Sequence, residues 1–228
     1  MKHIGIVGVT AEGAAECYRT ICRESVRRLG DNRHPEITLH NRSFHEILAA
    51  QEQRNWNRVA GYLLESIKIL ANSGADFAII PANSVHFALE ILRHNSPIPI
   101  LSIVDVTADE CMKHGYRKVA ILGVGLTLEG GLYSEPLKDR GISALLPITA
   151  DQEALNMIIY QEIVPGRVTE KGIARILRIL EKFNNDDCDA AILACTELPL
   201  VVNEKNAPLP CLDTTRLLAL AAVDEALK

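Results

Sequence analysis

The sequence contains two half-chains that resemble each other, and this internal repeat restricts the folds that it can adopt. Three pairs of segments match in the same order: Lys2–Thr10 with Lys118–Gly125, Asp76–Ser84 with Asp189–Glu197, and Pro97–Ser102 with Pro208–Asp213. In each pair the second segment lies about 110 residues after the first. Because matches at a nearly constant offset indicate a duplicated structural unit, the sequence predicts two similar domains.

Each half alternates strand-like segments with helix-like segments. Continuously apolar runs such as Ile4–Val7 and Ala190–Leu193 suit strands that are buried on both faces. Apolar residues at helical spacing occur between such runs, as in Trp56–Ser73. This alternation predicts an α/β fold of two similar, doubly wound, Rossmann-like domains, each with a parallel sheet and right-handed crossovers.

The other predicted elements follow the same pattern in both halves. The further strands are Ile37–His40, Phe77–Ile80, Ile98–Ile103, Val119–Leu122, Ala144–Leu146 and Leu209–Leu212. The further helices are Ala14–Leu29, Val85–His94, Val106–Lys113, Ala150–Ile163, Glu170–Phe183 and Thr214–Leu227.

We expect the first α/β domain to cover residues 1–100 and the second to cover residues 101–212. The last helix, within residues 213–228, could pack on either domain, and we group it with the first. Ligands of open parallel sheets bind beyond the carboxyl ends of the strands. Two similar domains that face each other would bring these ends to opposite sides of one cleft, where we expect the active site.

Composition and charge exclude several classes of function. The chain is 48% hydrophobic and 23% charged, which is typical of a globular protein. Its net charge is −5 and no run of Lys or Arg is longer than two residues, so we expect no nucleic-acid partner. The longest apolar runs are far shorter than the ~20 residues of a membrane-spanning helix. Since the first residues read as a strand and not as a signal peptide, we expect a cytoplasmic protein with no membrane partner.

The six cysteines are expected to be reduced thiols in the cytoplasm. Their spacing to one another and to the histidines is not typical of a zinc site, so we predict no metal. A dinucleotide fingerprint is missing because Gly123 and Gly125 lack the third glycine, and we predict no cofactor. Five of the cysteines lie within or just before predicted helices and strands, where they suit packing. Cys195 differs from them in its position.

Cys195 follows the predicted strand Ala190–Leu193 and precedes a polar pair at an expected helix start. The positive end of a helix dipole and free backbone N–H groups would favour a thiolate there, or bind a substrate carboxylate. The repeat places Ala82, Asn83 and Ser84 at the equivalent strand end of the first half.

A structural interpretation of each of these residues remains open. Cys195 could be a small buried core residue, as most cytosolic cysteines are. The side chains of Asn83, Ser84 and Thr196 could be helix caps. His86 lies near the start of its predicted helix, which also suits a cap or a surface position.

With these residues in view, the chain resembles the aspartate/glutamate racemase family over essentially its whole length. Asn83-Ser84-Val85-His86 is similar to the family's Asn-Thr-x-His, and Cys195-Thr196-Glu197 matches its Cys-Thr-Glu. The glycine-ended first strand and the closing Leu212-Asp213-Thr214 match as well. The resemblance implies an amino-acid racemase that needs neither pyridoxal phosphate nor a metal and that commonly forms a homodimer.

The resemblance also implies a mechanism in which one cysteine from each half flanks the α-carbon of an amino acid. One thiolate removes the α-proton and the other thiol returns a proton to the opposite face, since inversion needs a base and an acid on opposite sides. Cys195 matches the second of these cysteines. The expected substrate-binding residues are Thr10, Asn83, Ser84, His86, Thr127, Thr196 and Glu197.

The first of the two cysteines is replaced by Ala82, which cannot carry a proton. Ala82 has three alternative explanations. The protein belongs to a natural subgroup in which Cys195 has a different partner or none, the alanine was introduced to trap a ligand, or racemase activity has been lost. Some racemase-like relatives have threonine here, and related decarboxylases keep a single cysteine in the second half. The cations that hold a side-chain carboxylate in aspartate-specific members have no clear match, Arg42 and Lys171 included.

We therefore expect a cofactor-independent racemase or epimerase that acts at the α-carbon of an amino acid or a related carboxylate, with Cys195 as acid/base. The first alternative is a single-cysteine decarboxylase or other lyase of the same superfamily. The second alternative is a protein that binds a small molecule without turnover.

Overall fold

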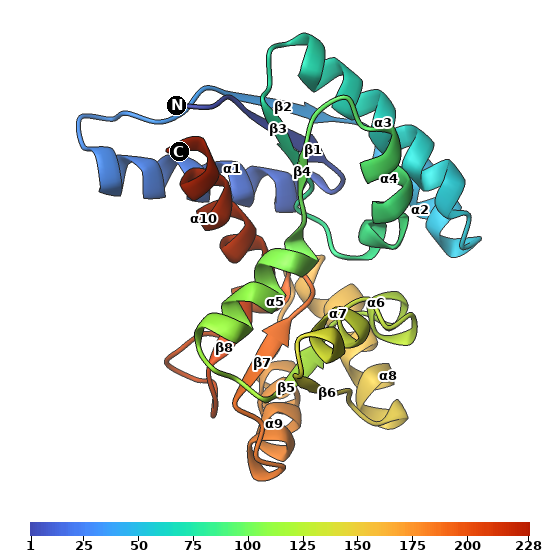
Figure 1. The fold of residues 1–228 in the computed structure, drawn as a ribbon. Coiled ribbons are helices and arrows are strands. Elements are labelled where there is room, and N and C mark those ends of the chain that lie inside the picture. Colours follow the sequence, from blue (N-terminus) through green and yellow to red (C-terminus); the bar gives the residue numbers. More distant parts are fainter. The chain divides into compact units, whose positions relative to one another are not determined.

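The computed structural model describes residues 1–228 and divides into two compact units. The first unit comprises residues 1–106 and 215–228, and the second comprises residues 107–214. Each unit is built on one four-stranded parallel sheet with helices packed around it (Figure 1). The predicted α/β class is confirmed. The chain passes between the units within helix α5 (Ile103–Lys113) and again at the start of helix α10 (Thr214–Ala226).

The first sheet has the strand order β2-β1-β3-β4. Its strands are β1 (Ile4–Gly8), β2 (Ile37–Asn41), β3 (Phe77–Ile79) and β4 (Ile100–Leu101). The helices that connect and cover them are α1 (Ala11–Leu29), α2 (Phe44–Glu52), α3 (Trp56–Asn72) and α4 (Leu89–Asn95), with the 3-10 helix η1 (Ser84–Ala88) before α4. All five residues of β1 are buried, which explains the continuous apolar run in the sequence.

The second sheet repeats this arrangement with the order β6-β5-β7-β8. Its strands are β5 (Lys118–Leu122), β6 (Ser143–Leu145), β7 (Ala190–Leu193) and β8 (Cys211–Asp213). The helices are α6 (Gly125–Glu129), α7 (Ser134–Asp139), α8 (Thr149–Ile158), the π-helix η2 (Ile159–Ile163), α9 (Glu170–Asn185) and the 3-10 helix η3 (Leu198–Leu200). The same strand order in both sheets is the structural counterpart of the sequence repeat.

A buried carboxylate fastens two helices of the second unit to each other. Asp151 of α8 is almost fully buried and accepts hydrogen bonds from Arg175 and Lys182 of α9, at 2.7 and 2.6 Å. A buried charge is costly unless it is paired and hydrogen-bonded, and the two cations compensate for the desolvation of this one. The apolar face of α9 packs on the sheet, and the two ion pairs with Asp151 hold α8 beside it.

Several helices differ from those predicted from the sequence. The predicted helix Val85–His94 is two helices, η1 and α4, and the predicted helix Ala150–Ile163 ends as the π-helix η2. The short helices α2, α6 and α7 are absent from the sequence prediction, since none exceeds nine residues and such a segment shows little helical periodicity. The helix expected after Cys195 is only the three-residue η3, in which Pro199 supplies no N–H group.

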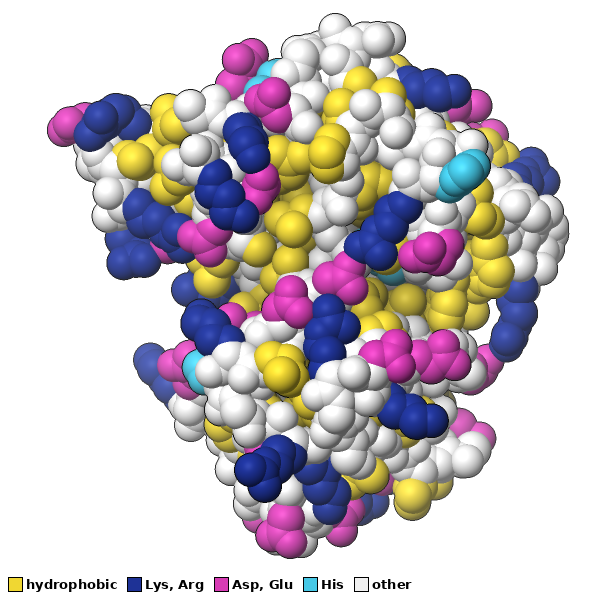
Figure 2. All heavy atoms as spheres, viewed as in Figure 1, with side chains coloured by type: hydrophobic (Ala, Val, Ile, Leu, Met, Phe, Trp, Pro, Cys, Tyr) yellow, Lys and Arg dark blue, Asp and Glu magenta, His cyan; other side chains and the backbone are white.

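Charged side chains of both signs lie interspersed on the face drawn in Figure 2, without a continuous basic surface there. Many of them belong to ion pairs within one unit, such as Arg28 with Glu24 and Asp224. None of the helices combines the length and the apolar character that crossing a membrane would require.

Candidate active site

In the first unit, the expected site residues lie beyond the carboxyl ends of two neighbouring strands. Thr10 follows β1, and Ala82 and Asn83 follow β3, which pairs with β1 in parallel. Ala82 and Asn83 are buried, whereas Ser84, the first residue of η1, is half-buried. The carboxyl edge of the first sheet thus carries all of the first-half candidates.

The second unit places its candidates in the same way. Thr127 is a buried residue of α6, which follows β5, and Cys195 follows the neighbouring strand β7. Gly123 allows the turn after β5 to lie against the segment that leads to Cys195, because a methyl group at this glycine would lie 3.0 Å from the carbonyl oxygen of Ala194. Thr196 and Glu197 come next and are half-buried.

The Cys195 thiol lies beside a carboxylate. Its Sγ–H group donates a hydrogen bond to Oε2 of Glu197 at 3.0 Å, and Cys195 is only 7% exposed. Burial raises the pKa of the Cys195 thiol well above its usual value, and the negative charge of Glu197 and the hydrogen bond to it raise this pKa further. The backbone N–H groups of Glu197 and Leu198 act in the opposite direction and do not outweigh these effects.

The expectation that a helix dipole favours a thiolate at Cys195 is wrong. Only the three-residue η3 follows, which is too short to provide a helix dipole, and the nearest charge is the carboxylate of Glu197. The resting group is therefore a protonated thiol with a proton acceptor within hydrogen-bond distance. This arrangement can produce a thiolate by transferring the proton to Glu197.

His86 has no ring nitrogen left for a substrate. Its Nδ1–H group donates to the carbonyl oxygen of Ala82 at 2.8 Å, and its Nε2 atom accepts from the N–H group of Ile103 at 3.4 Å. Complete burial lowers the pKa of His86 from 6.5 to about 4, so the ring is neutral at neutral pH. We correct its expected role as a substrate-binding residue: it joins the turn after β3 to the start of α5.

The hydroxyl groups of Thr10 and Ser84, the two candidates of this type in the first unit, have different hydrogen-bond partners. Thr10 is the N-cap of α1 and accepts a hydrogen bond from the N–H group of Gly13 at 3.3 Å. Ser84 accepts a hydrogen bond from the Nε2–H group of Gln51 at 2.7 Å. Gln51 has no counterpart in the sequence motifs, and it lies in α2, which the apolar pattern does not reveal. Asn83 precedes η1 but makes no side-chain cap hydrogen bond to it.

The cation Arg42 is engaged on the surface of the first unit. It pairs with Glu65 and Glu46 and lies over the ring of Tyr62 at 5.7 Å from the ring centre. Its charge is therefore compensated by carboxylates of the protein. No group of three or more His, Cys, Asp or Glu side chains is arranged to hold a metal ion.

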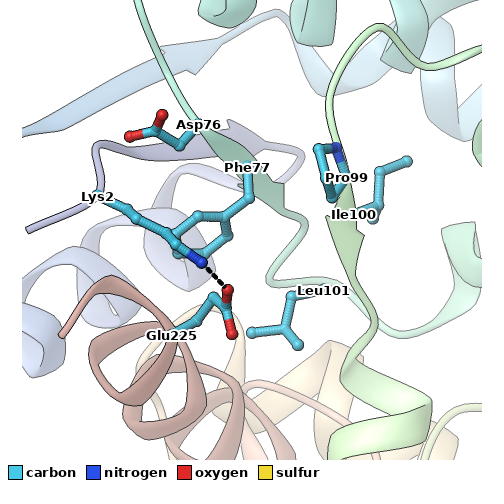
Figure 3. A pocket seen from close by; sticks show the side chains of 7 residues that line it. All are labelled: Lys2, Asp76, Phe77, Pro99, Ile100, Leu101 and Glu225. Atoms are coloured by element: carbon cyan, nitrogen blue, oxygen red, sulfur yellow. Dashed lines mark hydrogen bonds and ion pairs between the residues drawn. The ribbon is translucent and has the colours of Figure 1, made fainter. Parts of the chain in front are cut away.

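A cavity of about 290 Å³ lies at the opposite edge of the first sheet (Figure 3). It is lined by Lys2, Asp76 and Pro99, which precede β1, β3 and β4, and by Glu225 of α10. Lys2 forms an ion pair with Glu225, and Asp76 accepts a hydrogen bond from the N–H group of His3 at 2.6 Å. Because this cavity lies at the amino ends of the strands, it is separate from the candidate site.

The two units share one strand order, and a buried thiol lies beside a carboxylate at the end of the central strand β7. These features place the protein in the class of duplicated α/β proteins that carry a cysteine at a strand end. The chain matches a family model described as Asp/Glu/Hydantoin racemase over residues 6–222. The chain belongs to this family.

Two curated relatives are racemases. The broad specificity amino-acid racemase RacX of Bacillus subtilis is 27% identical over 154 residues, which are 68% of this chain and 66% of the relative. The glutamate racemase of Hydrogenobaculum is 26% identical over 151 residues, which are 65% of this chain and 56% of the relative. The chain thus spans less than two thirds of the length of these relatives.

Two solved structures are similar over their whole length. One is a candidate Asp/Glu racemase from Yersinia pestis, with 32% identity and a TM-score of 0.94, covering 100% of both chains. The other is an aspartate racemase homologue from Pyrococcus horikoshii, with 27% identity and a TM-score of 0.89, again covering 100% of both chains.

The neutral buried ring of His86 predicts a loss of stability in acid. Between pH 6.5 and pH 4 the unfolded chain takes up a proton at this residue and the folded chain does not, so the free energy of unfolding falls as the pH is lowered. The shift from 6.5 to about 4 corresponds to a loss of about 3 kcal/mol over this range. His86→Asn, which keeps a donor for the Ala82 carbonyl, is expected to remove this part of the pH dependence in urea unfolding measurements. His94→Asn, at an exposed histidine, serves as the control and is expected to leave the pH dependence of the free energy of unfolding unchanged.

Proposed function

We propose that this protein is a cofactor-independent isomerase that acts at the α-carbon of an amino acid, with Cys195 as its acid/base. The observation that carries the proposal is the buried thiol of Cys195, hydrogen-bonded to the carboxylate of Glu197 at 3.0 Å. Membership of a racemase family supports it, and RacX, a relative, is a broad specificity amino-acid racemase.

The proposed reaction begins with transfer of the Cys195 proton to Glu197. The thiolate then removes the α-proton of the substrate, and the electron pair of the broken C–H bond moves into the substrate carboxylate. Hydroxyl and amide donors stabilise the negative charge that develops there. We assign this role to Asn83, Ser84, Thr127 and Thr196. Return of a proton to the opposite face of the α-carbon inverts the substrate, whereas return to the same face restores it with its α-hydrogen exchanged.

Ala82 limits this chemistry to one face of the substrate. A methyl group can neither take nor give a proton, so the position matching the first cysteine supplies no acid on the opposite face. Cys195 alone can remove the α-proton, exchange it with solvent and return a proton to the same face. We therefore propose that exchange of the α-hydrogen is faster than inversion of the α-carbon.

This proposal predicts distinct rates of exchange and inversion in deuterated water. With both enantiomers of the proteinogenic amino acids as a panel, NMR is expected to show α-hydrogen exchange, with inversion slower by about 10²-fold, because a positioned acid contributes at least that factor. Ala82→Cys is expected to accelerate inversion far more than exchange. Cys195→Ala is expected to abolish both, and exchange at an unchanged rate in this variant would contradict the proposal.

The role of Glu197 predicts that Glu197→Gln makes the Cys195 thiol easier to ionise and yet slows α-hydrogen exchange. The pKa of the Cys195 thiol is expected to fall, because the carboxylate charge that raises it is removed. Alkylation of Cys195 by iodoacetamide, followed by mass spectrometry of its peptide, should then start at lower pH. Exchange of the α-hydrogen should nevertheless slow by at least about 10-fold, since the proton acceptor is lost. The exposed Glu204, changed to Gln, is the control, and equal behaviour of the two variants would rule out the assigned role.

A second candidate function, a single-cysteine decarboxylase, is supported by Ala82 together with Cys195. Its reaction would break a bond from the α-carbon of a disubstituted malonate to one carboxyl carbon, release carbon dioxide and protonate the resulting carbanion from Cys195. Release of carbon dioxide from such malonates without α-hydrogen exchange on amino acids would favour this function. The opposite result would favour the isomerase.

A further inference from the structure

The hydroxyl of Ser84 is fixed by a buried residue that lies outside the sequence motifs. Gln51 of α2 is 2% exposed, and its Nε2–H group donates to Oγ of Ser84 at 2.7 Å. This is the one hydrogen bond that the side chain of Ser84 makes within the protein. A hydroxyl oxygen that accepts from an amide keeps its own proton for another acceptor.

The surroundings of Gln51 argue against a packing role for its amide. Its neighbours Ile47 and Ala50 on α2 belong to the same apolar core as Ala82 and Val85, which flank the strand-end turn. An apolar side chain of this size would fill the same space without the cost of desolvating an amide. The amide is instead aimed at the one half-buried hydroxyl of this turn, at the edge of the core.

We infer that Gln51 is a positioning residue that directs the Ser84 O–H group toward the substrate carboxylate. Because the Gln51 amide donates, the Ser84 oxygen is occupied on the side of α2 and its proton points away from it. The hydroxyl then offers a donor, and not a lone pair, to an anionic group beyond the end of β3. This inference rests on the proposed function, since it assumes that the ligand of Ser84 is the carboxylate of an amino acid.

Two substitutions of Gln51 separate orientation from packing. Gln51→Met keeps the length and fills the space but removes the donor. KM for α-hydrogen exchange is expected to rise by roughly 3- to 10-fold, the effect of one neutral hydrogen bond, and kcat is expected to fall as well, because the same hydroxyl stabilises the charge that develops on the carboxylate. Gln51→Glu is nearly isosteric but accepts the proton of Ser84 and turns its lone pair outward. It is expected to raise KM further, by more than about 10-fold, because a charged group is involved.

A double-mutant cycle with Ser84→Ala tests whether Gln51 acts through Ser84. In the Ser84→Ala background, Gln51→Met is expected to have no further effect on KM, since the hydroxyl that it orients is absent. Gln152→Met is the matched control, because Gln152 donates at the same distance of 2.7 Å to the carbonyl oxygen of Pro147 in the second unit. Unchanged KM in Gln51→Met, or effects that add fully in the cycle, would overturn the inference.

Binding measurements keep this test separate from the test of the proposed function. α-Aminoisobutyrate has a carboxylate and no α-hydrogen, and malonate has two carboxylates and no amino group. Calorimetry measures the binding of either probe whether or not the protein turns it over. If the unmodified protein exchanges no amino acid, the proposed function fails, and a 3- to 10-fold weaker binding of either probe to Gln51→Met still supports the role of Gln51. Binding of neither probe to the unmodified protein overturns the inference. If Gln51→Met does not fold, as judged by circular dichroism, Gln51→Glu decides the question with the same readouts.

Discussion

The parallel direction of neighbouring strands determines where chemistry can occur in this protein. Every connection in a parallel sheet must return the chain to the amino edge, so all four carboxyl ends of each sheet lie at one edge. The strands that end in candidate residues, β1 with β3 and β5 with β7, are the central neighbours of their sheets. The loops that follow these strands therefore place polar groups close together at the carboxyl edge of each sheet, on a framework of buried strands. At the amino edge of the first sheet the charges are already paired, as Lys2 is with Glu225.

Several groups at these strand ends are oriented by a hydrogen-bond partner within their own unit. His86 joins the carbonyl of Ala82 to the start of α5, Gln51 holds the hydroxyl of Ser84, and Glu197 accepts from the thiol of Cys195. Such contacts exist because polar groups near a core must be hydrogen-bonded to compensate for their desolvation. The same requirement that stabilises the fold thus also fixes the direction in which each donor points.

The sequence predicts the framework of this site better than its electrostatics. The strands around Ile4–Val7 and Ala190–Leu193 could be predicted because burial on both faces leaves a continuous apolar run, and the repeat identified Cys195 as the cysteine at a strand end. The protonation of Cys195 could not be predicted, since it depends on burial and on the orientation of Glu197. Gln51 could not be found either, because its contact with Ser84 joins residues 33 positions apart through a helix too short to show a period.

The raised pKa of Cys195 has two consequences that oppose each other. Burial and the charge of Glu197 make the thiolate rare, which lowers the fraction of protein ready to react. Burial also makes the thiolate more basic once it forms, which narrows the difference in acidity between the thiol and the α-C–H bond of a substrate. Because that C–H bond is a very weak acid, a strong base present in a small fraction can outperform a weak base that is always ionised. Glu197 raises the pKa of the resting thiol through its charge and then receives the proton whose departure creates the thiolate. Once protonated, Glu197 carries no charge, so burial is what keeps the thiolate basic during the reaction.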